Sequence, residues 1–129
     1  MICLDASVLI AHVNPDDAHH RRARALLLRH AAQAFCASAL TLAEFYAQPA
    51  KAGEEALRKA MRGVDILEIA SVPVDAPERL AGLRASSGLK MPDCCVLDAA
   101  AATGAQVASF DTALRTAAEA LGYPLAAED

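Results

Sequence analysis

The chain has 129 residues, a formal net charge of −4 and a pI near 5.5. This length fits one domain, residues 1–129, that can bury a core without disulfide bonds. The acidic balance argues against tight, nonspecific binding of nucleic acid to a generally basic surface, but it does not exclude a nucleic-acid substrate.

No apolar run reaches the roughly 18 residues that a membrane span needs, and the first residues lack a charged leader region. We therefore expect a cytoplasmic protein without a membrane partner. The cysteines lack C-x-x-C spacing, and we expect them to be small apolar core residues in a reducing compartment rather than a disulfide or zinc framework. They are Cys3, Cys36, Cys94 and Cys95.

The first half of the chain predicts two buried strands, each followed by a helix. Residues 1–4 form an apolar run, and a helical turn over 7–11 is broken at Asn14-Pro15. Residues 16–32 have a helical pattern, and a second strand is expected over 34–37. Ser38 or Thr41 could cap the next helix, which is expected to run as far as Pro49.

The second half repeats this alternation. We expect helices over 53–63 and 76–86, a strand over 66–69, and a helix that starts near Asp93 and ends near Thr103. A strand over 106–109 leads to a helix over 111–121, and residues 123–125 could add a fifth strand or a tail. Alternating strands and helices favour an α/β fold with a mainly parallel central sheet of four to five strands flanked by helices.

Four acidic residues, Asp5, Glu44, Asp93 and Asp111, stand where a helix is expected to begin. Each has an ordinary interpretation, because the three aspartates could cap helices and Glu44 could complete a capping box with Thr41. Taken together, they could converge at the carboxyl ends of a parallel sheet, where ligands bind. Such a cluster needs a cation, or some of its members must stay protonated.

Oxygen ligands suit Mg²⁺ or Mn²⁺, which could activate a water for phosphodiester hydrolysis. Ser7 and Ser109 lie two residues from Asp5 and Asp111, and they could orient those carboxylates or simply cap the local helices. Both interpretations stay open.

The region with the most basic residues is His19 to Arg24, where Arg21, Arg22 and Arg24 could guide a nucleic-acid backbone or could form a solvated helix face. Asp98 is five residues beyond Asp93, which places it roughly 140° around a helix. We therefore expect it to pair with an arginine or to support the site indirectly.

Four segments resemble, in order and approximate spacing, the PIN-domain ribonucleases, and the short length resembles the VapC toxins within that family. The segments are Cys3-Leu4-Asp5-Ala6-Ser7-Val8-Leu9-Ile10, Ala43-Glu44-Phe45, Leu89-Lys90-Met91-Pro92-Asp93 and Ala105-Gln106-Val107-Ala108-Ser109-Phe110-Asp111. After Asp93 the chain reads Cys94-Cys95-Val96-Leu97-Asp98, where similar proteins more often carry Ala-Leu-Ile-Ala-Ala.

The resemblance implies a PIN-like three-layer sandwich and a Mg²⁺- or Mn²⁺-dependent endoribonuclease, the toxin of a toxin-antitoxin pair. It implies an RNA substrate, a cognate antitoxin and a homodimer. Asp5 and Asp93 would be the principal metal ligands, with Glu44 and Asp111 completing the catalytic quartet, and Ser7 matches a small hydroxyl residue that often follows the first aspartate.

Two other functions stay open. An aspartyl-phosphate-type phosphohydrolase could use Asp5 as nucleophile, although it would lack the acid that such enzymes need at position 7. A catalytically silent PIN-like interaction module would keep the fold without the chemistry.

Overall fold

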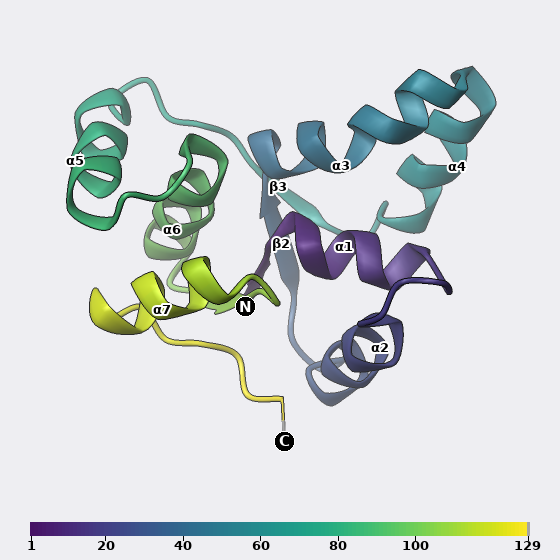
Figure 1. Cartoon of the computed structure of the whole chain (residues 1–129), viewed down its shortest axis with the longest axis horizontal. Helices are drawn as coiled ribbons and strands as arrows, with labels where there is room; N and C mark the ends of the chain where they lie inside the picture. The colour runs from purple at the N-terminus through teal and green to yellow at the C-terminus, as the bar shows by residue number, and fades with distance from the viewer. Residues whose placement is uncertain (129) are drawn as a thin grey trace.

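Residues 1–128 are described by a computed structural model, which has a four-stranded sheet between two layers of helices (Figure 1). The strands are β1 (Ile2–Leu4), β2 (Phe35–Ser38), β3 (Glu68–Ala70) and β4 (Gln106–Ala108). The helices are α1 (Ala6–Val13), α2 (His20–Arg29), α3 (Ala39–Ala52), α4 (Glu54–Gly63), α5 (Pro77–Ser87), α6 (Met91–Thr103) and α7 (Thr112–Ala120).

The sheet has the order β3-β2-β1-β4, and all its neighbouring strands are parallel. This confirms the predicted α/β fold with a parallel sheet. In place of a fifth strand, Leu125 forms an isolated parallel bridge to Val107 of β4. The chain builds outward from β1 through β2 to β3 and then crosses to β4 on the other side of β1, so the strand order reverses between β1 and β4. In open parallel sheets, ligands bind at this switch point, beyond the carboxyl ends of the strands.

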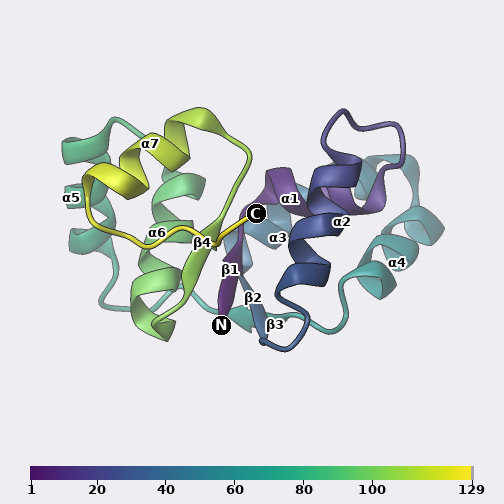
Figure 2. The same ribbon diagram turned by 90° about the horizontal axis from the view of Figure 1, so that it is seen from below.

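Alternating side chains on the short strands supply both halves of the core. Ile2 and Leu4 pack with α1, α2 and α3, whereas Cys3 points to the opposite face and packs with α6 and α7. Figure 2 shows α1 to α4 on one side of the sheet and α5, α6 and α7 on the other. All four cysteines are buried and free, which confirms that they are small core residues.

Several boundaries differ from the predictions. The second helix begins at His20 rather than near Asp16, because the side chains of Asn14 and Asp17 accept hydrogen bonds from backbone N–H groups two residues further on and hold this segment in turns. The third helix is capped by Ser38 and continues through Pro49 to Ala52. The third strand lies two residues later than expected at its start and pairs along only one edge.

Two helix ends position the elements that lead to the site. Gly88 adopts φ +71°, a left-handed conformation that favours glycine, and there α5 ends. The chain then turns at Lys90, where the backbone is extended, and α6 begins with Met91 and Pro92. Among the helices of residues 1–128, none has both the length and the apolar character that a membrane crossing requires.

Candidate active site

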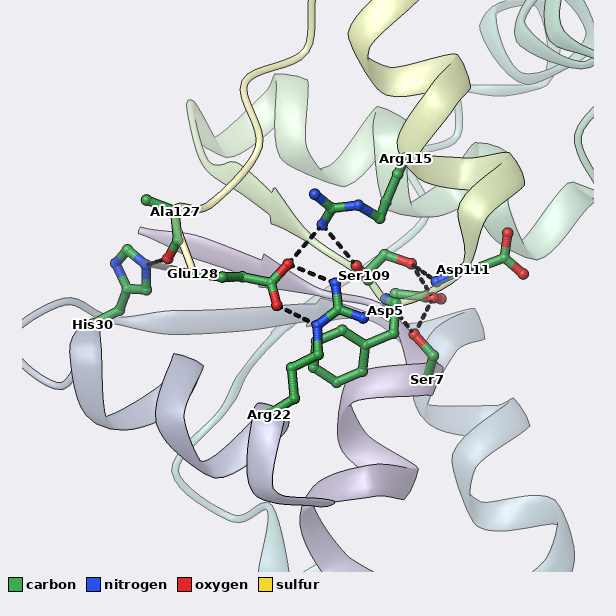
Figure 3. Close-up of polar contacts among 10 residues, drawn as sticks. Asp5, Ser7, Arg22, His30, Ser109, Asp111, Arg115, Ala127 and Glu128 are labelled. Carbon is green, nitrogen blue, oxygen red and sulfur yellow. Dashed lines mark hydrogen bonds and ion pairs between the residues drawn. The ribbon is translucent and has the colours of Figure 1, made fainter. Parts of the chain in front are cut away.

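Asp5 is the best-ordered carboxylate of the site because three donors hold it. It follows β1, caps α1 and is only 4% exposed. Its Oδ1 accepts a hydrogen bond from the Ala6 N–H at 2.8 Å, and its Oδ2 accepts from the hydroxyls of Ser7 at 2.8 Å and Ser109 at 2.7 Å (Figure 3). A carboxylate has about four acceptor positions, so one direction of Asp5 remains open to a further ligand.

The two serines also join the loops that follow β1 and β4. The Phe110 N–H donates to Ser7 Oγ at 3.0 Å, and the Asp111 N–H donates to Ser109 Oγ at 3.0 Å. Ser109 is fully buried. Each hydroxyl therefore contacts both the Asp5 carboxylate and the backbone leading to Asp111, so the two serines orient Asp5 and also organise the local backbone.

Asp111 caps α7, as predicted for a helix-capping aspartate. Its Oδ1 accepts from the Leu114 N–H at 2.9 Å, and the residue is exposed. In Figure 3 its carboxylate extends away from Asp5. In this arrangement the residue serves the helix start, while its backbone stays tied to the Asp5 network.

Asp93 lies in the first turn of α6, and the charges of all three other acids affect its pKa. Its pKa is raised from 3.8 to about 6, first by partial burial and then by the charges of Asp5, Asp111 and Glu44 in that order, while Lys90 opposes them. The Asp93 carboxyl is therefore partly protonated near neutral pH when no cation is bound.

Glu44 lies five residues inside α3 rather than at its start, which corrects the prediction that all four acids begin helices. The capping box with Thr41 does not form, because Ser38 caps the helix and the Thr41 hydroxyl has no partner within residues 1–128. Desolvation and the charge of Asp5 raise the pKa of Glu44, and Lys90 lowers it. One and a half turns of helix thus bring Glu44 toward the same acids.

The four predicted residues therefore lie close enough for their charges to influence Asp93, but their side chains do not surround an ion-sized site. Among residues 1–128, no three His, Cys, Asp or Glu side chains form a group that could hold a metal. The donor set itself fits a hard cation, since it consists of four carboxylates and Lys90 is the positive charge that lowers the pKa of both Glu44 and Asp93. A divalent ion would relieve the repulsion that raises the pKa of Asp93.

The predicted basic residues separate in space. Arg22 forms an ion pair with Glu128, and its guanidinium lies 4.4 Å from the centre of the Phe110 ring. Arg24 lines an apolar groove on the other side of α2 next to His12, and Arg21 is exposed.

Asp98 pairs with Arg79 at 2.9 Å and is largely buried, which agrees with the expectation that it has an arginine partner.

Three nearby residues were not predicted as part of the site. Lys90 was noted in the sequence only as part of the segment Leu89 to Asp93. Its position three residues before Asp93 is a local signal that could have identified it. Arg115 donates to the Ser109 carbonyl at 3.1 Å and to Glu128 at 3.1 Å. No local pattern could have linked Glu128 to Arg22, because 106 residues separate them.

A parallel sheet whose switch point gathers acidic residues defines a class of α/β proteins that bind ligands at the strand ends. The model of the PIN domain family matches residues 2–120, and the chain therefore belongs to that family. This confirms the predicted family.

Solved structures similar to the chain agree with this fold. A VapC20 toxin of Mycobacterium tuberculosis, described as cleaving the sarcin-ricin loop, has 21% identity and a TM-score of 0.72, and the match covers 95% of this chain and 96% of that one. A toxin-antitoxin complex from Klebsiella pneumoniae has 20% identity and a TM-score of 0.70, covering 87% and 88%. FitAcB from Neisseria gonorrhoeae has 18% identity and a TM-score of 0.77, covering 99% and 98%. No curated protein is a significant sequence match.

Proposed function

We propose that this protein is a metal-dependent endoribonuclease and the toxin of a toxin-antitoxin pair, with Asp5, Glu44, Asp93 and Asp111 as its active site. The observation that carries the proposal is that the carboxylates of Asp5, Asp111 and Glu44 all lie close enough to Asp93 to raise its pKa, beyond the effect of its burial. The family match and the similar folds of toxins support the same function.

Asp5 and Asp93 are the proposed principal ligands of Mg²⁺ or Mn²⁺, and Glu44 and Asp111 complete the set. Such an ion, when bound, supplies a water of lowered pKa and neutralises phosphoryl charge. Ser7 and Ser109 keep the Asp5 carboxylate in one orientation through their hydrogen bonds to its Oδ2. Because burial and the neighbouring carboxylates raise the pKa of Asp93, a bound cation would compete there with a proton, and metal binding should weaken as the pH falls below about 6.

The substrate that we propose is RNA, whose phosphates need positive partners close to the acids. Lys90 and Arg115 lie near the acids, and Arg22 lies beside Phe110, which directly precedes Asp111. Contributions from Arg21 and Arg24, the other basic residues predicted from the sequence, are weaker parts of the proposal, since Arg24 faces a different surface.

An antitoxin is the proposed protein partner. An apolar groove of about 330 Å³ lies between α1, α2 and the segment after α4. Leu28 and Ile66 line it and are exposed, which is typical of a surface that a partner protein covers. The proposal of a homodimer rests on family resemblance. The single domain over residues 1–129 and a cytoplasmic location remain proposals, the latter supported by the four free thiols.

Within residues 1–128, no contact favours the aspartyl-phosphate alternative. That chemistry needs a general acid at position 7, and the hydroxyl of Ser7 instead donates to Asp5. A silent interaction module would have no need for four acids that act on one another's charge, and an activity assay separates it from a nuclease.

The test is cleavage of single-stranded RNA by the purified protein with Mn²⁺ or with EDTA. We expect cleavage only with metal, and we expect Asp5→Asn and Asp93→Asn to abolish it while circular dichroism shows a folded chain. Asp16→Asn changes an exposed aspartate outside the site and should keep full activity. Full activity in both site variants would refute the mechanism.

A further inference from the structure

Two arginines from distant parts of the chain donate hydrogen bonds to the carboxylate of Glu128, close to the candidate active site. Arg22 of α2 donates through Nε and Nη2 to the two oxygens of Glu128, the latter contact at 2.8 Å. Arg115 of α7 donates through Nη1 to the second oxygen at 3.1 Å. A guanidinium fork that binds a carboxylate through two parallel bonds has the geometry that also recognises a phosphate.

This arginine pair is directly coupled to the candidate active site. Arg115 Nη1 also donates to the Ser109 carbonyl at 3.1 Å, and the hydroxyl of Ser109 donates to Asp5. Figure 3 shows Glu128, Arg22 and Arg115 beside Ser109 and Asp5. An anion bound by the two arginines would therefore lie next to the carboxylates rather than on a remote surface.

Aromatic groups stand beside the same position. The Phe110 ring has the Arg22 guanidinium 4.4 Å from its centre and the His19 ring at 5.3 Å. Flat side chains of this kind stack on the bases of single-stranded nucleic acid, while arginines hold the backbone. Phe110 is buried at 8% exposure, whereas His19 is exposed, so His19 is the ring that a base could stack on. The surroundings of Glu128 thus combine a stacking ring with two arginines for the backbone.

Glu128 can leave this position without unfolding the domain. The tail before it is anchored independently: the Val107 N–H donates to Pro124, the Ala126 N–H donates to Val107, and the His30 ring contacts the Ala127 carbonyl. The side chain of Glu128 retains 19% of its exposure, and those of Arg22 and Arg115 retain 40% and 29%. Solvent, and hence a competing anion, can reach the pair.

We propose that Arg22 and Arg115 form a binding site for a backbone phosphate of RNA and that the Glu128 carboxylate occupies it until RNA displaces it. The inference rests on the proposed ribonuclease function, since it assigns part of that substrate's path. Arg22 lowers the pKa of Glu128, so the carboxylate is ionised and competes with phosphate at neutral pH. Glu128 thereby restrains RNA binding from within the chain.

The test is the affinity for a fluorescein-labelled ten-uridine RNA, measured by fluorescence anisotropy in EDTA so that the RNA stays intact. Glu128→Gln should bind about 3–10-fold more tightly than the wild type. One additional phosphate contact should also steepen the salt dependence of log K by about 0.7. Glu119→Gln removes the same charge from an exposed position on α7 and is the matched control, expected to stay within about twofold.

The arginine arm of the test compares two arginines of α2. Adding Arg22→Ala to Glu128→Gln should remove the gain, whereas adding Arg29→Ala, at an exposed position at the end of the helix, should leave most of it. A Glu128→Gln variant that binds no better than Glu119→Gln overturns the inference, as does a gain that survives Arg22→Ala.

Cleavage with Mn²⁺, measured separately, distinguishes the two proposals. If the wild type cleaves RNA and Glu128→Gln shows no gain in binding, the phosphate site alone is refuted. If nothing cleaves but the gain is present and depends on Arg22, the phosphate site stands and the ribonuclease function is refuted. Absence of RNA binding in every variant refutes both.

Discussion

Replacing Asp93 by Asn should make the metal-free protein more stable at neutral pH. In the folded chain the pKa of Asp93 is about 6, against an ordinary value of 3.8. Below pH 3.8 the carboxyl is protonated in both the folded and the unfolded chain, so it does not lower the free energy of unfolding. As the pH rises toward 6 the unfolded chain releases its proton first, and stability is lost progressively until the folded carboxyl is also ionised.

The two pKa values set an upper limit of about 3 kcal/mol on this loss. Because Asp93 is only partly buried, solvent screening reduces the effect to about 1–2 kcal/mol. For a chain of this size that corresponds to a rise of roughly 3–8 °C in the melting midpoint of Asp93→Asn. The gain should be present at pH 7.5 and nearly absent at pH 4.

The assay is urea unfolding in EDTA, followed by circular dichroism at both pH values. Glu78→Gln is the matched control because Glu78 is an exposed acid in the first turn of α5, so the substitution also removes a favourable charge at a helix start. It should be neutral or slightly destabilising. An Asp93→Asn advantage that is equal at pH 4 and 7.5, or absent at both, would refute the claim that the acids converge on Asp93.

Three further predictions follow from the contacts of the site and its surroundings. Ser109→Ala removes one of the three donors to Asp5 and leaves the Asp111 N–H without its acceptor, so unfolding free energy should fall by about 1–3 kcal/mol and the cleavage rate by roughly tenfold or more. Mn²⁺ at about 100 times its dissociation constant should add roughly 2.7 kcal/mol to wild-type stability, and Asp5→Asn should abolish that gain in a thermal melt. Arg79→Ala should lower the melting midpoint more than Arg58→Ala does, because it strands the buried Asp98, whereas the Arg58 ion pair is exposed. Unchanged stability in Ser109→Ala, a metal response in Asp5→Asn, or equal effects of the two arginine variants would contradict the respective prediction.

The sequence was most informative where local chemistry determines structure. Asp5 and Asp111 were predicted as residues at the start of a helix, and both cap one through a backbone N–H. The alternation of apolar strands with helical segments also determined the class of fold. These features depend on neighbours within a few residues, which a single sequence displays directly.

Features that depend on distant parts of the chain were harder to predict. Glu44 lies inside α3 rather than at its start, because Ser38 and not Thr41 caps the helix. Ser38 and Thr41 are both good capping residues, and only tertiary packing selects between them. The contact between Arg22 and Glu128 arises from the path of the carboxyl-terminal tail along β4, which no local pattern encodes.

The most direct test of the central claim is anomalous diffraction from crystals of the protein grown with Mn²⁺. The account predicts a manganese peak coordinated by the carboxylates of Asp5 and Asp93, with Glu44 and Asp111 facing the ion directly or through waters. Crystals with Mn²⁺ bound elsewhere, or with no peak among these four residues at a concentration that supports RNA cleavage, would contradict it.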